Sequence, residues 1–149
     1  MLIGVISDTH GLLRTEAVEA LQGSDLILHA GDIGPAAILD QLKNIAPVKA
    51  IRGNVDVEAW ARRLPATRTV MAGDLQIYLI HDVKQLGRTP DVHVIVSGHS
   101  HKPTVVWRDG VLFLNPGSAG RRRFKLPVTI ARIRVSGRTL EPEIVTLCD

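Results

Sequence analysis

The stretch that decides the fold runs from Leu2 to His10 and reads Leu2-Ile3-Gly4-Val5-Ile6-Ser7-Asp8-Thr9-His10. Its first half is a short, nearly continuous apolar run, which is typical of a β-strand buried on both faces. Its second half is polar and includes the carboxylate of Asp8 and the imidazole of His10. Because ligands of α/β sheets bind beyond the carboxyl ends of the strands, this order predicts a buried strand that delivers Asp8 and His10 to a site.

Outward from this strand, the first half of the chain alternates predicted strands and helices. Leu13, Ala17 and Leu21 recur at the spacing of one helix face. Pro35 suits the first position of a second helix, because the N–H that proline lacks has no partner there. The remaining elements expected in this half are strands at 26–28 and 48–51 and a short helix at 58–64.

The second half is expected to be mostly β. Asp109-Gly110 is a strong two-residue hairpin signal, and Gly73 and Ser136-Gly137 mark two further turns. Pro142 cannot donate to a ladder, so the last strand is predicted at a sheet edge. This order of elements fits two stacked sheets with helices on the outside, in a single domain spanning residues 1–149. The strands expected here are 67–71, 75–80, 92–96, 105–108, 111–114, 128–135 and 140–147.

Residue types that bind metals recur just past five of the predicted strands. One such residue alone is usually a helix cap or a loop residue, whereas the whole set indicates one site at the sheet edge. The segments are Ser7-Asp8-Thr9-His10, Gly31-Asp32, Gly53-Asn54-Val55-Asp56, His81-Asp82 and Gly98-His99-Ser100-His101.

The chemistry of these side chains favours two transition-metal ions. Asp8 and His10 are two residues apart, as are His99 and His101, so each pair would point to the same side of an extended chain. Mixed imidazole, carboxylate and amide ligands suit Mn²⁺, Fe, Zn²⁺, Ni²⁺ or Co²⁺ rather than Ca²⁺ or Mg²⁺ alone. Two dications facing two carboxylates would leave a positive site, which favours a phosphate.

The five segments, in this order, resemble the motifs of the calcineurin-like metallophosphoesterase superfamily, above all its small single-domain bacterial and archaeal phosphodiesterases. The resemblance spans nearly the whole chain and implies a four-layer α/β/β/α sandwich, two stacked mixed sheets flanked by helices. Asn115-Pro116-Gly117-Ser118 also matches the small-enzyme branch. The resemblance implies one metal ion on Asp8, His10, Asp32 and His101, and a second on Asp32, Asn54, His81 and His99, with Asp32 bridging.

These features predict hydrolysis of a phosphodiester, or of another small phosphate ester, by a metal-bound hydroxide. A dication makes hydroxide available at neutral pH, because it lowers the pKa of bound water to about 7. Mn²⁺ is the expected ion, with Ni, Fe, Zn or Co as alternatives. The catalytic residues, acting through the metals, would be Asp8, Asp32, Asn54, His81 and His99.

Two other functions stay open. A trafficking-complex subunit of eukaryotes has the same fold and serves as a protein scaffold, although a scaffold has no need of a complete ligand set. A nuclease is the third hypothesis. Only 3% of the residues are aromatic, which disfavours base stacking and therefore single-strand nucleic-acid binding.

Two positions depart from the family pattern. Larger members carry a histidine after the motif asparagine as a general acid, and here that position is Val55, so Asp56 is expected to be a structural carboxylate. Asp82 stands where glycine usually follows the histidine, and it is interpreted as a partner of a ligand or, in preference, as a solvated loop residue. His29 and His93 are expected to be structural.

The charge pattern fits an anionic small-molecule substrate. The formal net charge is +3, and the one charge run is Arg121-Arg122-Arg123 with Lys125. We interpret this run as a solvated loop in preference to a substrate-binding lip, although arginine forks match phosphate oxygens. The single cysteine, Cys148, and the lack of a signal peptide or membrane-length apolar run predict a cytoplasmic protein without a membrane partner. A homo-oligomer stays open.

Overall fold

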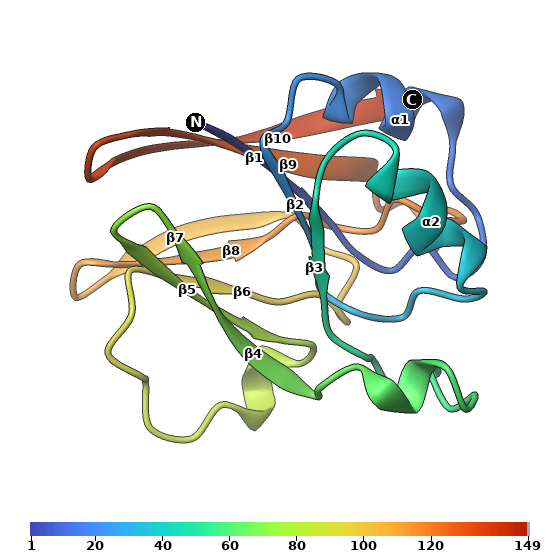
Figure 1. The fold of residues 1–149 in the computed structure, drawn as a ribbon, viewed down its shortest axis with the longest axis horizontal. Coiled ribbons are helices and arrows are strands. Elements are labelled where there is room, and N and C mark those ends of the chain that lie inside the picture. The colour runs from blue at the N-terminus through green and yellow to red at the C-terminus, as the bar shows by residue number, and fades with distance from the viewer. Residues whose placement is uncertain (149) are drawn as a thin grey trace.

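In the computed structural model, which describes residues 1–148, the strands form two five-stranded sheets. The sheets lie one above the other (Figure 1). The first has the strand order β10-β9-β1-β2-β3, and the second has the order β4-β5-β6-β8-β7. The first sheet consists of β1 (Leu2–Ile6), β2 (Leu26–His29), β3 (Val48–Ala50), β9 (Val128–Ser136) and β10 (Thr139–Cys148). The second consists of β4 (Thr67–Ala72), β5 (Leu75–Ile80), β6 (Val94–Val96), β7 (Thr104–Arg108) and β8 (Val111–Asn115).

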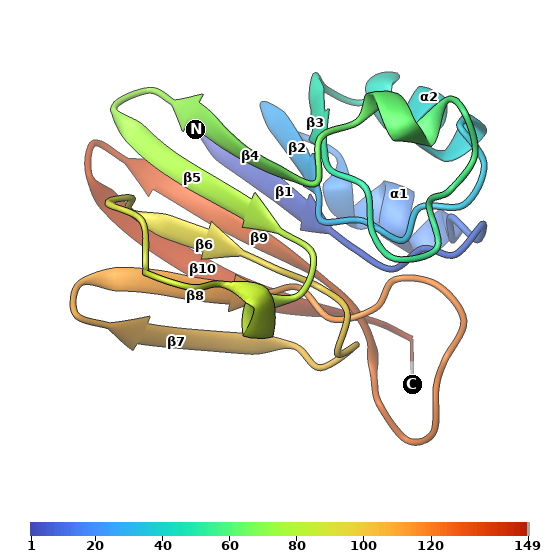
Figure 2. The ribbon, with the colours of Figure 1, turned by 90° about the horizontal axis from the view of Figure 1, so that it is seen from below.

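The helices form the outer layers of the sandwich. Helix α1 (Thr15–Leu21) contacts β9 and β10, and α2 (Ala37–Lys43) contacts β3, so both lie against the first sheet. Over the second sheet lies the short 3₁₀ helix η2 (Val83–Gln85), in front of β8 in Figure 2, and a second 3₁₀ helix, η1 (Ala61–Arg63), precedes β4. The predicted sandwich of two stacked sheets flanked by helices is confirmed. Among residues 1–148, no helix combines the length and the apolar character needed to span a membrane.

The side chains of β1 alternate between two hydrophobic cores, one on each face of the first sheet. Successive side chains of a strand point to opposite faces, so Ile3 and Val5 face the second sheet and pack with Leu79 between the sheets. Ile6 faces the other way and packs with Leu21 of α1. Four consecutive residues of β1, Ile3 to Ile6, are buried, and only Leu2 at the strand start is partly exposed, which confirms a strand buried on both faces.

The sequence located most strand ends to within a residue or two, but two details differ. Helix α2 begins at Ala37, and Pro35 lies before it with its carbonyl accepting the Ile38 N–H. The last turn is Gly137-Arg138, because Ser136 still pairs with Thr139. The edge position of β10, which carries Pro142, is confirmed.

Parallel strands determine where the polar loops meet. β1, β2 and β3 are parallel to one another in the first sheet, and β5, β6 and β8 are parallel in the second. The loops that follow β1, β2, β3, β5 and β6 therefore leave the sandwich at the same end (Figure 2). The five predicted segments lie in these loops.

Candidate metal centre

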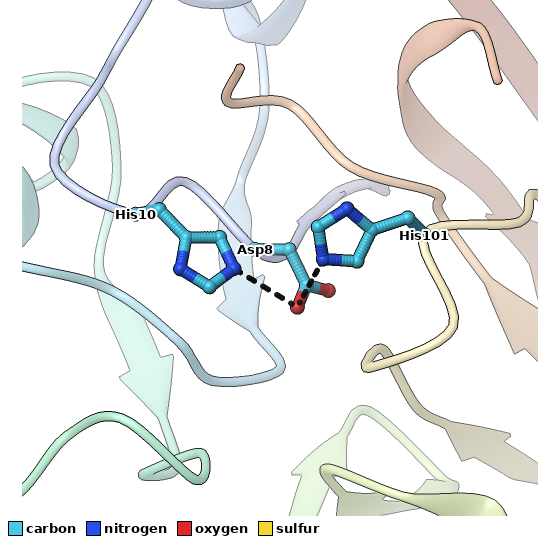
Figure 3. A group of neighbouring side chains, drawn as sticks. All are labelled: Asp8, His10 and His101. Atoms are coloured by element: carbon cyan, nitrogen blue, oxygen red, sulfur yellow. Dashed lines mark ion pairs between the residues drawn. The ribbon is translucent and has the colours of Figure 1, made fainter. Parts of the chain in front are cut away.

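The first group of possible metal ligands forms around the buried carboxylate of Asp8. Asp8 Oδ1 lies 3.7 Å from His10 Nε2 and 3.4 Å from His101 Nε2. Figure 3 shows the two imidazoles on either side of this carboxylate, one from the loop after β1 and one from the loop after β6. One ligand atom from each of these three residues lies within 4.8 Å of the other two, close enough to hold one ion.

The second group consists of Asp32, His81 and His99. Asp32 Oδ2 lies 3.1 Å from His81 Nε2, and both side chains are buried. Asn54 adds an amide here, with its Nδ2 3.2 Å from His99 Nδ1. His99 is 42% exposed and Asn54 is also exposed, so this is the side from which a substrate can approach.

The two groups meet at Asp32. Its Oδ2 atom lies 3.7 Å from His10 Nε2 in the first group and 3.1 Å from His81 Nε2 in the second. His81 Nε2 is in turn 4.0 Å from Asp8 Oδ1. All the predicted ligands are thus brought together, and a carboxylate oxygen of Asp32 lies between the two groups.

Four of these ligands have a backbone conformation that the sequence analysis did not predict. Asp8, His10, His99 and His101 have φ angles of 56°, 46°, 69° and 63°, in the left-handed region. The prediction of an extended chain is therefore wrong, although Asp8 and His10 do lie in the same group, as that prediction implied. His99 and His101 belong to different groups, because the turn between them separates their side chains.

Asp56 holds the loop that carries Asp32. Its carboxylate accepts the N–H of Asp32 at 2.9 Å, of Ile33 at 3.0 Å and of Gly53 at 2.8 Å. Asp32 Oδ1 accepts the N–H of Val55 at 3.1 Å, which leaves Oδ2 directed at the imidazoles. Asp56 is thus a structural carboxylate, as predicted, and it joins the loops after β2 and β3.

Other supporting residues were not assigned a role from the sequence. Ser7 Oγ donates to Asp8 Oδ2 at 2.7 Å, and the His99 N–H donates to the same oxygen at 3.1 Å. Asn115 Nδ2 donates to the Gly98 carbonyl at 2.9 Å, and Ser118 Oγ donates to the Asp8 carbonyl at 3.1 Å. The segment 115–118 was recognised as a motif, and these bonds give its physical purpose.

One glycine is required by close packing at the centre. Gly31 has a φ of 102°, and an added Cβ would lie 2.7 Å from His81 Nδ1. A side chain at this position would strain the backbone and displace His81.

The charges of the centre are strongly coupled. Burial alone would raise the pKa of Asp8, but the adjacent imidazoles of His10 and His101, the hydroxyl of Ser7 and the nearby His81 lower it far below its usual value. Burial also acts to raise the pKa of Asp32, and His81 and the Val55 N–H reverse the shift. For His81, burial alone would lower the pKa, but Asp32 and the Ala30 carbonyl raise it. Both carboxylates therefore stay ionised beside buried imidazoles.

The buried polar atoms fit a metal ion. His81 Nδ1 lies 2.7 Å from the Ala30 carbonyl and must donate to it, so Nε2 of the neutral ring presents a lone pair to Asp32. A proton or a metal ion is needed between these two acceptors. Within residues 1–148, three atoms that face the centre, Asp8 Oδ1, His10 Nε2 and His81 Nε2, are buried without a hydrogen-bond partner. Metal-binding histidines typically donate their other N–H to a carbonyl, as His81 does.

His29 is structural, as predicted. Its Nδ1 accepts the Gly31 N–H at 3.1 Å, which fixes the proton on Nε2. Nε2 lies 3.1 Å from Thr9 Oγ1, which donates to the Ile33 carbonyl at 2.6 Å. His93 is also structural, because its Nδ1 accepts the Gln76 N–H at 2.9 Å.

Asp82 is less exposed to solvent than expected for the solvated loop residue that the sequence analysis favoured. Its Oδ1 accepts the Lys84 N–H at 3.1 Å, which caps η2. Its Oδ2 lies 3.7 Å from His99 Nε2, and only 18% of the side chain is exposed. The carboxylate thus faces a residue of the second group, as the alternative interpretation proposed.

The basic run lies in an exposed loop between β8 and β9. Arg121, Arg122 and Arg123 are exposed, and Phe124 is 93% exposed. Arg122 Nη2 donates to the Cys148 carbonyl at 3.2 Å, so this guanidinium is directed at the end of β10. This contact agrees with the interpretation of the basic run as a surface loop in preference to a substrate-binding lip.

Comparisons with known proteins agree with this geometry. Residues 1–138 match the family model of the calcineurin-like phosphoesterase superfamily domain. A probable metallophosphoesterase of Methanothermobacter thermautotrophicus is 35% identical over 160 aligned positions, which cover 97% of this chain and 92% of that protein.

The chain belongs to the calcineurin-like phosphoesterase superfamily.

Solved structures of other proteins have the same fold as this chain. Vps29 of Chaetomium thermophilum superposes with a TM-score of 0.79 at 23% identity, covering 99% of this chain and 96% of that one. An archaeal phosphodiesterase superposes with a TM-score of 0.77 at 22% identity, covering 97% of this chain and 100% of that one. These likenesses confirm the predicted sandwich fold, and the family match together with the 35% identical relative confirms the predicted family.

We expect His29 to make the metal-free protein acid-sensitive. Burial lowers its pKa to about 4 from 6.5, so the folded state favours the neutral ring. The stability contribution is complete above pH 6.5 and is lost as the pH falls toward 4, by a total of about 3 kcal/mol. The free energy of unfolding, measured by denaturant titration in EDTA between these pH values, should fall more steeply in the natural protein than in His29→Gln. Equal slopes would show that His29 does not titrate this way.

Proposed function

We propose that this protein hydrolyses phosphodiesters, or other small phosphate esters, with two divalent metal ions. The observation that carries the proposal is the position of Asp32 Oδ2, between His10 of one ligand group and His81 of the other. Asp8, His10, Asp32 and His101 would hold one ion. Asp32, Asn54, His81 and His99 would hold the other. Mn²⁺ is the proposed ion, with Ni, Fe, Zn or Co as alternatives.

The bound ions would supply Lewis-acid polarisation of the phosphate and a lowered pKa for water, as in other two-metal hydrolytic sites. The chain supplies the rest. The bonds that Asp8 accepts from Ser7 and from the His99 N–H hold one of its oxygens and direct the other to the first group. For Asp32, the Val55 N–H holds Oδ1 and leaves Oδ2 to the two groups, and Asp56 accepts the Asp32 backbone N–H. The catalytic residues proposed on this basis are Asp8, Asp32, Asn54, His81 and His99.

A non-catalytic protein scaffold is the alternative, since the fold is shared with Vps29. The unpartnered buried nitrogens of His10 and His81, which face the carboxylates of the centre, favour the hydrolase, because a scaffold would gain stability by pairing or replacing them. A screen of Mn²⁺-loaded protein against a phosphomonoester, bis(p-nitrophenyl) phosphate, a cyclic nucleotide and an oligonucleotide tests the hydrolase. Preference for the oligonucleotide would instead indicate a nuclease, and no turnover of any substrate would support the scaffold.

We expect two Mn²⁺ ions to bind per chain, and both to depend on Asp32. Asp32→Ala should weaken both sites, by more than the 10–100-fold typical of losing only a partner of a ligand. His101→Ala is the matched control and should weaken one site, because His101 lies in the first group alone. Calorimetric titration of metal-free protein measures both affinities. Saturation at a single ion, or an Asp32→Ala variant that keeps one site intact, would contradict the shared carboxylate.

We expect the rate to depend steeply on the leaving group, because Val55 cannot donate a proton. General-acid help is typically worth about 10²–10⁴ in rate. Val55 is 53% exposed, so a histidine fits there without repacking. Rates for a series of phosphodiesters, plotted against leaving-group pKa, should give a steep slope that flattens in Val55→His at unchanged metal content. A flat plot for the natural protein would reveal another donor, and a steeper plot for Asp82→Asn would identify Asp82 as that donor.

A further inference from the structure

A surface hollow adjoins the second ligand group. It measures about 480 Å³ and is lined by Arg52, Gly53, Asn54, Asp56, Val57 and Arg62. Asn54 belongs to both the hollow and the candidate metal centre, where its amide lies 3.2 Å from the His99 ring. A molecule bound at the centre therefore has this hollow directly beside it.

The two arginines of the hollow are held by backbone carbonyls. Arg52 donates from Nη1 to the Leu64 carbonyl, and Arg62 donates from Nε to the Val57 carbonyl at 3.0 Å. Each guanidinium keeps further N–H groups after making this bond. Because the side chains are already restrained, they lose less rotational freedom when they bind an anion.

The acidic groups nearby are committed elsewhere. Asp56 is only 5% exposed. Its oxygens accept backbone N–H groups of Asp32, Ile33 and Gly53. Glu58 does not line the hollow, and its Oε2 accepts the Trp60 indole N–H at 3.2 Å. The hollow thus presents guanidinium donors.

We infer that this hollow is an anion subsite, which takes a second negatively charged group of the substrate. The inference rests on the proposed function, which puts the reacting phosphate at the metal centre. The substrate class is a phosphodiester with a short ester arm that ends in a phosphate or carboxylate. Guanidinium forks match both groups, and bonds between ions are stronger than neutral ones.

The experiment compares two p-nitrophenyl phosphodiesters whose second arm is a propyl chain ending in a phosphate or in a hydroxyl. The Mn²⁺-loaded natural protein should show a higher kcat/KM for the phosphate-ended diester. Arg62→Gln should reduce this preference about tenfold or more through KM, as expected for lost hydrogen bonds between charged groups. It should leave the hydroxyl-ended diester nearly unchanged.

Matched variants locate the effect. Arg63→Gln removes an exposed charge that neighbours Arg62 but does not line the hollow, and it should preserve the preference. The triple change of Arg121, Arg122 and Arg123 to Gln should preserve it as well. An equal loss in Arg63→Gln, a loss in the triple variant instead, or no preference in the natural protein would overturn the subsite.

A binding measurement separates failure of the subsite from failure of the proposed function. If neither diester is hydrolysed, the hydrolase proposal fails. Propyl phosphate is then titrated calorimetrically into metal-free protein. Weaker binding by Arg62→Gln than by Arg63→Gln would support the anion site, and equal or absent binding by the two variants would overturn it.

Discussion

Two ionised carboxylates lie beside buried imidazole nitrogens at one end of the sandwich, and much of the chain around them serves to hold them there. Asp8 and Asp32 keep their charge although burial opposes it, because imidazoles and N–H groups surround them. His81 donates its Nδ1 proton to the Ala30 carbonyl. When the ring is neutral, His81 Nε2 therefore contacts Asp32 without carrying a proton. Such an arrangement needs a cation between the two groups. The same requirement explains why His10 Nε2 and His81 Nε2 are buried without a partner among the described residues.

The backbone that supports these charges is itself strained. Asp8, His10, Asp32, His99 and His101 all have positive φ, a conformation that costs of order 1–3 kcal/mol per residue and clusters at functional sites. Bonds between loops offset this cost. The Asp8 N–H donates to the Gly31 carbonyl at 3.0 Å, and the His10 N–H donates to the Asp32 carbonyl at 2.9 Å. The loops after β1 and β2 therefore hold each other in shape.

The open side of the centre holds the two positions at which this sequence departs from the motif pattern that it resembles. Val55 removes a proton donor, and its backbone N–H instead fixes Asp32. Asp82, in place of a glycine, faces His99 and caps η2. The restrained guanidinium groups of Arg52 and Arg62 lie beyond Asn54. In the proposed function these residues surround the non-reacting part of a substrate, whereas Asp8, Asp32, His81 and His101 behind them are buried.

By itself, the sequence determined the strands and the candidate ligands, because both depend on local patterns. The apolar run Leu2–Ile6 followed by Asp8 and His10 predicted a buried strand with a site at its end, and Asp109-Gly110 predicted a hairpin whose turn residues both have positive φ. Only the tertiary structure decided that Asp8, His10, His99 and His101 adopt left-handed backbone conformations, that Asp56 accepts N–H groups from two loops, and that Arg52 and Arg62 share a hollow. The spacing of two residues predicted a shared side on the assumption of an extended chain. Contacts between loops far apart in sequence hold those residues in the left-handed region instead, and no local pattern encodes such contacts.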